Sequence, residues 1–361
     1  MHRNKNKLFF GILVCVIAAF FAFGRANPAS LPTRQVILPP PLAQRKTSGV
    51  EPPYRVRWLG PHQLVVGTIQ QYWYQAQSDA PWQPIPLPTD SSCLSVHYYH
   101  FTLLSDGRIG LLKECTGKPD RRWGHDFTVT LVAYDQHTHQ VAQLVDQTLP
   151  DAGEFTWDPI QKRGVFTPIG IYSTLYWLTP DRVEPMPITL RKGGRSWYLP
   201  DSVIELLRYQ ADPKAVGSMP LPVGLARDPA WSPSGDRLVF WATLETIGQN
   251  DPFPVVPWDI YLLDPTTLTV ERIVNQIRDP THLLWSPDGQ ALIYISGRDW
   301  WTTQGIWRYS FAQHRSILVQ AGHFSDVALS PDGNTLAATQ CFDATCAQFA
   351  VWTYDIRGLV Q

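Results

Sequence analysis

Trp285-Ser-Pro-Asp-Gly-Gln-Ala-Leu-Ile-Tyr294 is the stretch that decides the fold, because close copies of it occur three times in the last third of the chain. The other copies are Trp231-Ser-Pro-Ser-Gly-Asp-Arg-Leu-Val-Phe240 and Leu329-Ser-Pro-Asp-Gly-Asn-Thr-Leu-Ala-Ala338. Each joins two apolar stretches through a turn in which proline sets the first φ and glycine accepts the left-handed conformation. The repeat therefore predicts three β-hairpins of one design.

Further strands follow these hairpins in a regular order. An alternating stretch with a central aromatic residue is predicted as a third strand at 260–264, 306–309 and 351–355, and a fourth follows the first two at 268–274 and 315–319. Four successive antiparallel strands make one blade of a β-propeller. The last blade lacks a fourth strand, so we expect the apolar run at 34–38 to supply it and close the ring.

Three weaker copies of the repeat lie earlier in the chain. Their turns are Trp58-Leu-Gly-Pro61, Leu104-Ser-Asp-Gly107 and Trp157-Asp-Pro159, with third strands at 72–74, 131–135 and 175–178. Spacings of about 44 to 54 residues suit propeller repeats, apart from one longer gap that holds an insertion at 191–224. The sequence predicts an all-β protein whose residues 54–361 form a six-bladed β-propeller of four-stranded antiparallel blades. A β-sandwich with chance turn similarity is the alternative.

The N-terminal residues 1–24 predict a signal peptide or a membrane anchor. Arg3, Lys5 and Lys7 precede the uncharged apolar run 8–24, which is long for a signal peptide and short for a membrane span. Seven prolines within residues 25–53 predict an extended tether. We expect an exported protein of the cell envelope, periplasmic or extracellular, that contacts the membrane only through its N-terminal segment.

Cysteine usage agrees with export. The four cysteines beyond the leader are Cys93, Cys115, Cys341 and Cys346, and three pairings of them are possible. The short segment from Cys341 to Cys346 could staple a hairpin loop, which would leave Cys93 with Cys115. The spacings lack a paired CxxC and no histidine is suitably placed for zinc, so neither a metal nor a cofactor is expected.

Composition bounds the classes of partner. The chain is 44% hydrophobic and 12% aromatic but only 17% charged, which suits a large core of aromatic side chains packed on sheets. Without the basic leader the body is slightly acidic, and such a body does not attract phosphate backbones. Nucleic acid is therefore not an expected partner.

The Ser-Pro-Asp-Gly turn between apolar strands, followed by a strand such as Ile260-Tyr-Leu-Leu-Asp264, resembles the WD40-like PD40 repeat of the TolB propeller family. The resemblance covers about residues 50–358 and implies a six-bladed, envelope-exposed propeller that binds protein partners. Only the tether precedes the first blade here, whereas TolB has an additional α/β domain. Prolyl-oligopeptidase-type peptidases have similar repeats, but this chain has no Gly-x-Ser-x-Gly motif, and we expect no hydrolase domain and no enzyme.

Function is expected where the repeat is broken, on the face that carries the loops between second and third strands and the loops between blades. Arginine and tryptophan are the side chains that most often dominate protein interfaces. The main hypothesis is a monomeric, non-catalytic scaffold that binds an envelope or secreted protein there. The predicted binding residues are Arg121, Arg122, Trp123, Phe253, Trp258, Arg298, Trp300, Trp301, Arg227, Asp228, Arg278 and Asp279.

Two alternatives place the site at the mouth of the central channel. A glycosidase-like or lactonase-like propeller enzyme would need convergent carboxylates, for which the candidates are Asp228, Asp279 and Asp326. A carbohydrate-binding module would stack sugar rings on Trp123, Trp300 and Trp301. Neither His97 with His100 nor His137 with His139 is expected to form a site, because the first pair faces opposite sides of a strand and the second lies in a turn.

Overall fold

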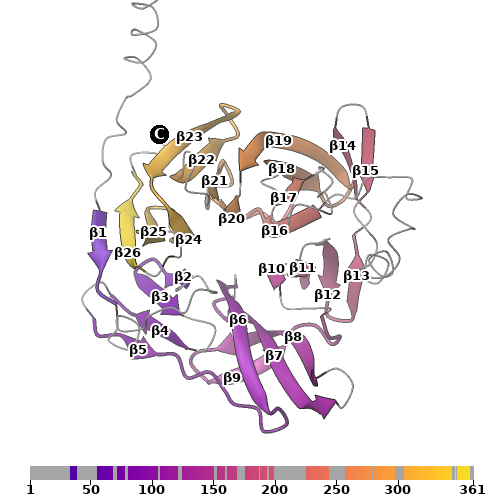
Figure 1. Ribbon diagram of the computed structural model, residues 1–361, viewed down its shortest axis with the longest axis vertical. Coiled ribbons are helices and arrows are strands. Elements are labelled where there is room, and N and C mark those ends of the chain that lie inside the picture. Colours follow the sequence, from indigo (N-terminus) through magenta and orange to yellow (C-terminus); the bar gives the residue numbers. More distant parts are fainter. Residues whose placement is uncertain are drawn as a thin grey trace, which may run out of the picture.

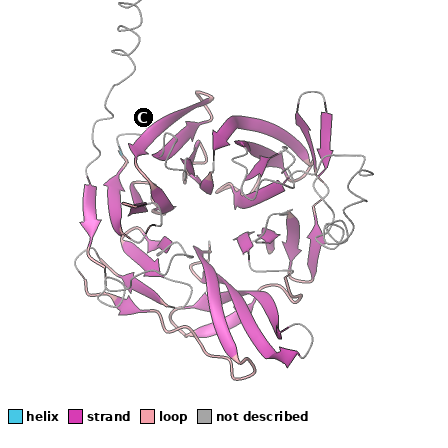
Figure 2. Cartoon of the chain, in the orientation of Figure 1, coloured by secondary structure: helices cyan, strands magenta, loops and turns pink. Residues whose placement is uncertain are grey.

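Six β-sheets surround a common axis in the computed structural model (Figure 1). Strands and connecting loops account for the ring, and the described residues contain no α-helix (Figure 2). The structure describes residues 33–38, 55–67, 71–77, 80–104, 106–120, 124–149, 153–158, 161–168, 175–186, 188–192, 195–198, 225–243, 257–278, 280–296, 305–343, 346 and 348–357. The predicted all-β propeller of six four-stranded blades is confirmed.

Each blade is an antiparallel sheet, and in blades 1 to 5 the four strands follow one another in sequence from the axis outward. Blade 1 contains β2 (Arg55–Gly60), β3 (Gln63–Gly67), β4 (Tyr72–Gln75) and β5 (Gln83–Pro84). Blade 2 contains β6 (Ser95–Leu103), β7 (Ile109–Asp120), β8 (Gly124–Asp135) and β9 (Gln140–Gln143). Blade 3 contains β10 (Gly153–Asp158), β11 (Arg163–Pro168), β12 (Tyr176–Thr179) and β13 (Arg182–Pro185).

The second half of the ring repeats this order. Blade 4 contains β16 (Leu225–Trp231), β17 (Leu238–Thr243), β18 (Pro257–Asp264) and β19 (Thr269–Arg278). Blade 5 contains β20 (Thr281–Trp285), β21 (Ala291–Ser296), β22 (Gly305–Ser310) and β23 (Arg315–Ala321). Blade 6 contains β24 (Phe324–Leu329), β25 (Thr335–Cys341), β26 (Phe349–Asp355) and β1 (Thr33–Val36). A separate hairpin of β14 (Thr189–Lys192) and β15 (Arg195–Tyr198) lies between blades 3 and 4 in the sequence, so the insertion begins slightly before residue 191.

The ring is closed by strands from opposite ends of the chain. β1 pairs antiparallel with β26, so that Thr33 lies opposite Tyr354 and Val36 opposite Val351 (Figure 1). This confirms the predicted closure, and part of the Pro-rich segment 25–53 thus belongs to blade 6. Val36 also packs against the apolar cluster shared by blades 1 and 6, so the pairing is fixed by burial as well as by backbone hydrogen bonds.

The repeated turn is explained by its own hydrogen bonds. Gly289 adopts a φ of +68° and its N–H donates to the carbonyl of Ser286 at 2.8 Å. The Ser286 hydroxyl donates to the Asp288 carboxylate and accepts the N–H of Ala291 at 2.8 Å. Serine, aspartate and glycine therefore recur because each satisfies one requirement of the turn.

The tryptophan that precedes the turn joins neighbouring blades. In blade 5, the indole N–H of Trp285 donates to the carbonyl of Ala230 in blade 4 at 2.9 Å, and that side chain is only 8% exposed. Trp58 of blade 1 makes the equivalent bond to Ala328 of blade 6 at 3.2 Å. Trp58 and Trp285 are therefore core residues that couple successive blades.

The cysteines form the two expected disulfides, Cys93–Cys115 in blade 2 and Cys341–Cys346 in blade 6. The leader at 1–24, most of the tether and residues 199–224 of the insertion lie outside the described residues. Within the described part of the chain, no helix is long and apolar enough to cross a membrane. The choice between signal peptide and anchor therefore stays a prediction.

We predict that Val36→Asp lowers the melting temperature by several degrees, because it places a carboxylate in the apolar seam between blades 6 and 1. Thr33→Asp on the same strand is the matched control, since Thr33 is exposed and the change should leave the melting temperature nearly unchanged. Circular dichroism melts of the two variants check this. Equal melting temperatures for both would show that β1 does not hold the ring closed.

Candidate functional site

A pocket of about 370 Å³ lies on the propeller axis and is lined by residues from the innermost strands of all six blades, β2, β6, β10, β16, β20 and β24. We call it the axial pocket. Its lining residues are Arg57, Trp58, His100, Phe101, Thr102, Leu103, Glu154, Phe155, Thr156, Asp228, Pro229, Ala230, His282, Leu283, Leu284, Ala328, Leu329 and Pro331. Because each blade contributes one strand, residues far apart in the sequence meet here.

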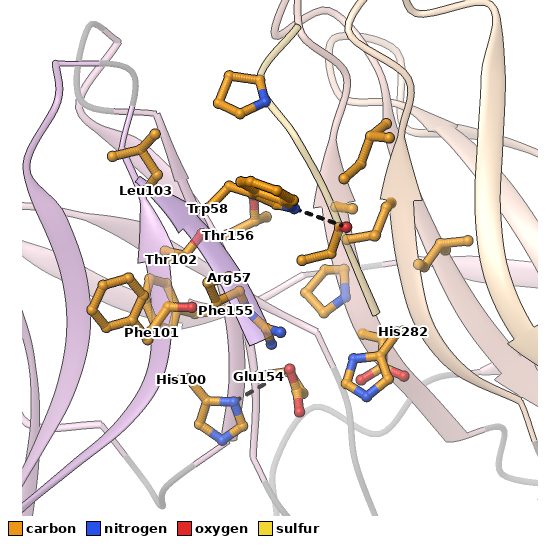
Figure 3. A pocket seen from close by; sticks show the side chains of 18 residues that line it. Arg57, Trp58, His100, Phe101, Thr102, Leu103, Glu154, Phe155, Thr156 and His282 are labelled. Carbon is orange, nitrogen blue, oxygen red and sulfur yellow. Dashed lines mark hydrogen bonds and ion pairs between the residues drawn. The ribbon is translucent and has the colours of Figure 1, made fainter. Parts of the chain in front are cut away.

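The axial pocket has a polar end and an apolar end (Figure 3). Every blade begins with its innermost strand, so the starts of these strands share the face that carries the blade-to-blade loops. The ionisable side chains come from the early part of the strands, whereas Trp58, Leu103, Leu284 and Leu329 come from nearer the repeated turns. The polar end therefore lies at the centre of the face on which sequence analysis predicted function.

Backbone strain accompanies three of the polar side chains. His100, Asp228 and His282 adopt φ values of 52°, 50° and 52°, in the left-handed region that residues other than glycine rarely occupy. Each lies at an irregularity in the pairing of an innermost strand with its neighbour. A left-handed residue costs about 1 kcal/mol or more, and such strain is typical of functional sites. Here the same bulge recurs in blades 2, 4 and 5, each time with an ionisable residue.

One set of contacts centres on Asp326, which is 1% exposed. Its carboxylate accepts the N–H of Val56 at 2.6 Å and the guanidinium of Arg57 at 2.9 Å, and it lies 3.2 Å from Nε2 of His282. Burial would raise the Asp326 pKa, but the charges of Arg57 and His282 outweigh it and keep the pKa below its ordinary value. This carboxylate joins blades 6, 1 and 5.

A second set of contacts joins blades 1, 2 and 3. Nδ1 of His100 lies 2.9 Å from Nη1 of Arg55 and 3.3 Å from Oε2 of Glu154. Burial lowers the pKa of His100, which is only 5% exposed. Burial would also raise the Glu154 pKa, but His100 and Arg55 outweigh it, so that this pKa lies well below its ordinary value. Glu154 is thus held as a carboxylate.

Asp228 has a different environment. It is half-buried in the axial pocket, and among the described residues no hydrogen bond or ion pair is formed by its carboxylate. Burial raises its pKa to about 6, helped by the negative charge of Glu154. The pocket therefore holds two carboxylates on neighbouring blades whose environments shift their pKa values in opposite directions, an arrangement found where proton transfer is required.

The predicted partner-binding residues divide into four groups. Asp228 lines the axial pocket. Arg227 and Trp258 pack on each other instead of projecting freely: the guanidinium carbon lies 4.2 Å from the centroid of the indole, and Arg227 donates to the carbonyl of Pro280. Arg278 ends β19, and nothing further is described of its side chain. The others lie outside the described residues: Arg121, Arg122, Trp123, Phe253, Arg298, Trp300, Trp301 and Asp279.

Sequence reasoning missed Arg55, Arg57, Glu154 and both pocket histidines. His100 was not expected in a site because strand alternation placed it opposite His97, but the bulge in β6 breaks that alternation. A signal was nevertheless present. The residues that stand seven positions before the turn glycines 107, 235, 289 and 333 are His100, Asp228, His282 and Asp326. Aligning the repeats on the glycine places these four ionisable residues in one column.

In the described part of the chain, no group of three or more His, Cys, Asp or Glu side chains is placed to hold a metal ion. The ionisable side chains that line the axial pocket are Arg57, His100, Glu154, Asp228 and His282.

Comparisons with known proteins find only distant likenesses. No family model matches the sequence, and no curated protein matches it either. Among solved structures, an oligogalacturonate lyase in complex with manganese matches with 12% identity and a TM-score of 0.49, over 83% of this chain and 75% of the other. The oligogalacturonate lyase of Vibrio parahaemolyticus matches with 12% identity and a TM-score of 0.47, over 83% and 76%. TolB from Acinetobacter baumannii matches with 11% identity and a TM-score of 0.45, over 84% and 63%.

The propeller architecture rests on the six sheets of the structure itself, and membership of the TolB repeat family is not shown, because no family model matches. The comparisons correct one expectation. The prediction that the chain is not an enzyme is wrong as a deduction from the fold, because the solved structures that match include oligogalacturonate lyases, which are enzymes. A missing hydrolase motif therefore does not decide the question. At 12% identity the likeness concerns architecture, and no activity is carried over from it.

We predict that replacing aspartate by asparagine has opposite effects on the melting temperature at Asp228 and at Asp326. The Asp228 pKa is raised from 3.8 to about 6, so the contribution of this carboxyl to stability is lost as the pH rises through 6. At pH 7.5 the wild-type protein holds an ionised carboxylate that burial disfavours. Asp228→Asn removes this charge and should raise the melting temperature at pH 7.5 by about 2 °C. The Asp326 pKa is lowered, so its contribution is present at neutral pH and lost only in acid. Asp326→Asn should therefore lower the melting temperature by at least about 5 °C at pH 7.5.

Melts at pH 7.5 and pH 4 check both variants. The gain from Asp228→Asn should shrink at pH 4, where the wild-type carboxyl is already protonated. A loss of stability from Asp228→Asn at pH 7.5 would show that this carboxylate is paired like that of Asp326.

Proposed function

We propose that the axial pocket binds a small polyhydroxylated molecule of the carbohydrate type. One observation carries this proposal. A single cavity of about 370 Å³ has a polar end rich in hydrogen-bond donors and acceptors and an apolar end. Pockets that bind small molecules start at about 300 Å³ and combine apolar walls with a few placed polar groups.

The two ends match the two kinds of surface on a sugar ring. A hydroxyl group both donates and accepts hydrogen bonds, and the polar end offers acceptors at Glu154 and Asp228 beside the imidazoles of His100 and His282. The C–H face of a ring is apolar and is suited to the wall formed by Trp58 and the leucines. A ligand with charges of one sign alone would leave either the carboxylates or the arginines without a complement.

The compartment proposed for this activity lies outside the cytoplasm. Two disulfides support it, because such bonds persist in oxidising compartments. Small carbohydrates of the cell envelope or its surroundings are then the accessible ligands.

We predict that at least one of three methyl glycosides, of a neutral hexose, an N-acetylhexosamine or a hexuronic acid, binds and gives saturation-transfer signals by NMR. His282→Gln should weaken its binding at least tenfold, because a pocket donor or acceptor is changed. His137→Gln is the matched control, since His137 is exposed in the turn of blade 2 and the same change should leave affinity unchanged. The proposal fails if none of the three glycosides binds, or if both variants lose affinity equally.

A further inference from the structure

We infer that the axial pocket also cleaves a glycosidic bond of the carbohydrate it binds, with Asp228 as the proton donor and Glu154 as the fixed carboxylate that stabilises the reacting carbon. This inference rests on the proposed function and goes one step beyond it, from binding to hydrolysis. It uses two carboxylates that line the axial pocket.

The two carboxylates line one pocket but have different surroundings. Glu154 on β10 is fixed from the side by His100, and Nη1 of Arg55 lies 4.0 Å from its Oε1. Asp228 on β16, in the next blade, lines the same pocket from a left-handed backbone position. The Asp326 carboxylate is committed to Arg57 and to the backbone of β2, so it is not available for chemistry. Only the pair from blades 3 and 4 combines exposure to the pocket with different surroundings.

The charges around Asp228 agree with these tasks. The groups that act on it from the packed elements are Glu154 of β10, Arg227 of its own strand, His282 of β20 and Arg55 of β2. Burial and the Glu154 charge favour the protonated carboxyl, and they outweigh the cations. The Asp228 pKa of about 6 leaves a proton to give near neutral pH, while Glu154 stays ionised.

The reaction balances with water as the only co-reactant. Asp228 gives its proton to the glycosidic oxygen while the bond from that oxygen to the anomeric carbon breaks, and the bonding electrons leave with the oxygen as an alcohol. The Glu154 carboxylate stabilises the positive charge that develops on the anomeric carbon. A water oxygen then bonds to this carbon, and the proton it loses returns to the Asp228 carboxylate. One glycoside and one water become a free sugar and an alcohol.

The test compares two leaving groups on the same sugar. For each sugar class named above, hydrolysis of the 4-nitrophenyl glycoside and of the methyl glycoside is measured with the full chain between pH 4 and 8. We expect turnover whose kcat/KM falls about tenfold per pH unit above about 6, as the donor loses its proton. 4-Nitrophenolate is a weak base and can leave without being protonated. Methoxide is a strong base, so the methyl glycoside needs a proton donor to release methanol. Asp228→Asn should therefore lose at least about 100-fold on the methyl glycoside and much less on the nitrophenyl glycoside.

Controls separate this inference from the proposed function. Asp264→Asn makes the same chemical change in an exposed turn of blade 4 and should retain wild-type turnover. Glu154→Gln should lose activity on both leaving groups, since it acts on the carbon and not on the oxygen that leaves. Binding of methyl glycosides without hydrolysis of any substrate would overturn the inference and leave the proposed function standing. An equal loss on both leaving groups in Asp228→Asn would also overturn it, because a proton donor must discriminate between them.

Discussion

The buried carboxylate of Asp326 is the contact on which the closed ring depends at its axis. It accepts a backbone N–H from β2, pairs with Arg57 and contacts His282, so that blades 6, 1 and 5 meet at one group. Removing one partner of a buried ion pair costs about 3 to 5 kcal/mol, because the other charge remains buried without a complement. Asp326 thus joins the first and last blades near the axis, together with the Trp58 bond to Ala328, while β1 joins them at the rim.

Asp228 occupies the same position of the repeat as Asp326, seven residues before the turn glycine, but serves a different purpose. Its carboxylate has no partner among the described residues, its backbone is strained, and burial opposes its ionisation. These features all cost stability, and proteins retain such costs mainly where function needs them. One position of the repeat therefore supports the ring in blade 6 and lines the candidate site in blade 4.

The fold was predictable because each blade carries local signals. The Ser-Pro-Asp-Gly turn fixes a hairpin within ten residues, and the unpaired run at 34–38 predicts the closing strand. The candidate site was not predictable in the same way, since its residues come from strands about 50 residues apart. Bulges also break the two-residue alternation that orients a strand, which is why His100 reaches the axial pocket. Sequence reasoning pointed to the face on which the polar end of the axial pocket lies, but it favoured residues that it assigned to loops, such as Trp258, which lies in β18 and packs against Arg227.

The charge of the axial pocket turns on a single proton. Arg57 pairs with Asp326, and Arg55 lies beside Glu154, so each of these two carboxylates has a cation beside it. Arg227, on the same strand as Asp228, packs on Trp258 and also attracts the Asp228 carboxylate. Burial and the negative charge of Glu154 outweigh that attraction, so the Asp228 pKa is raised to about 6, and ionisation above that pH adds one negative charge to the polar end. The group inferred to donate the proton therefore also changes the charge that a bound carbohydrate meets.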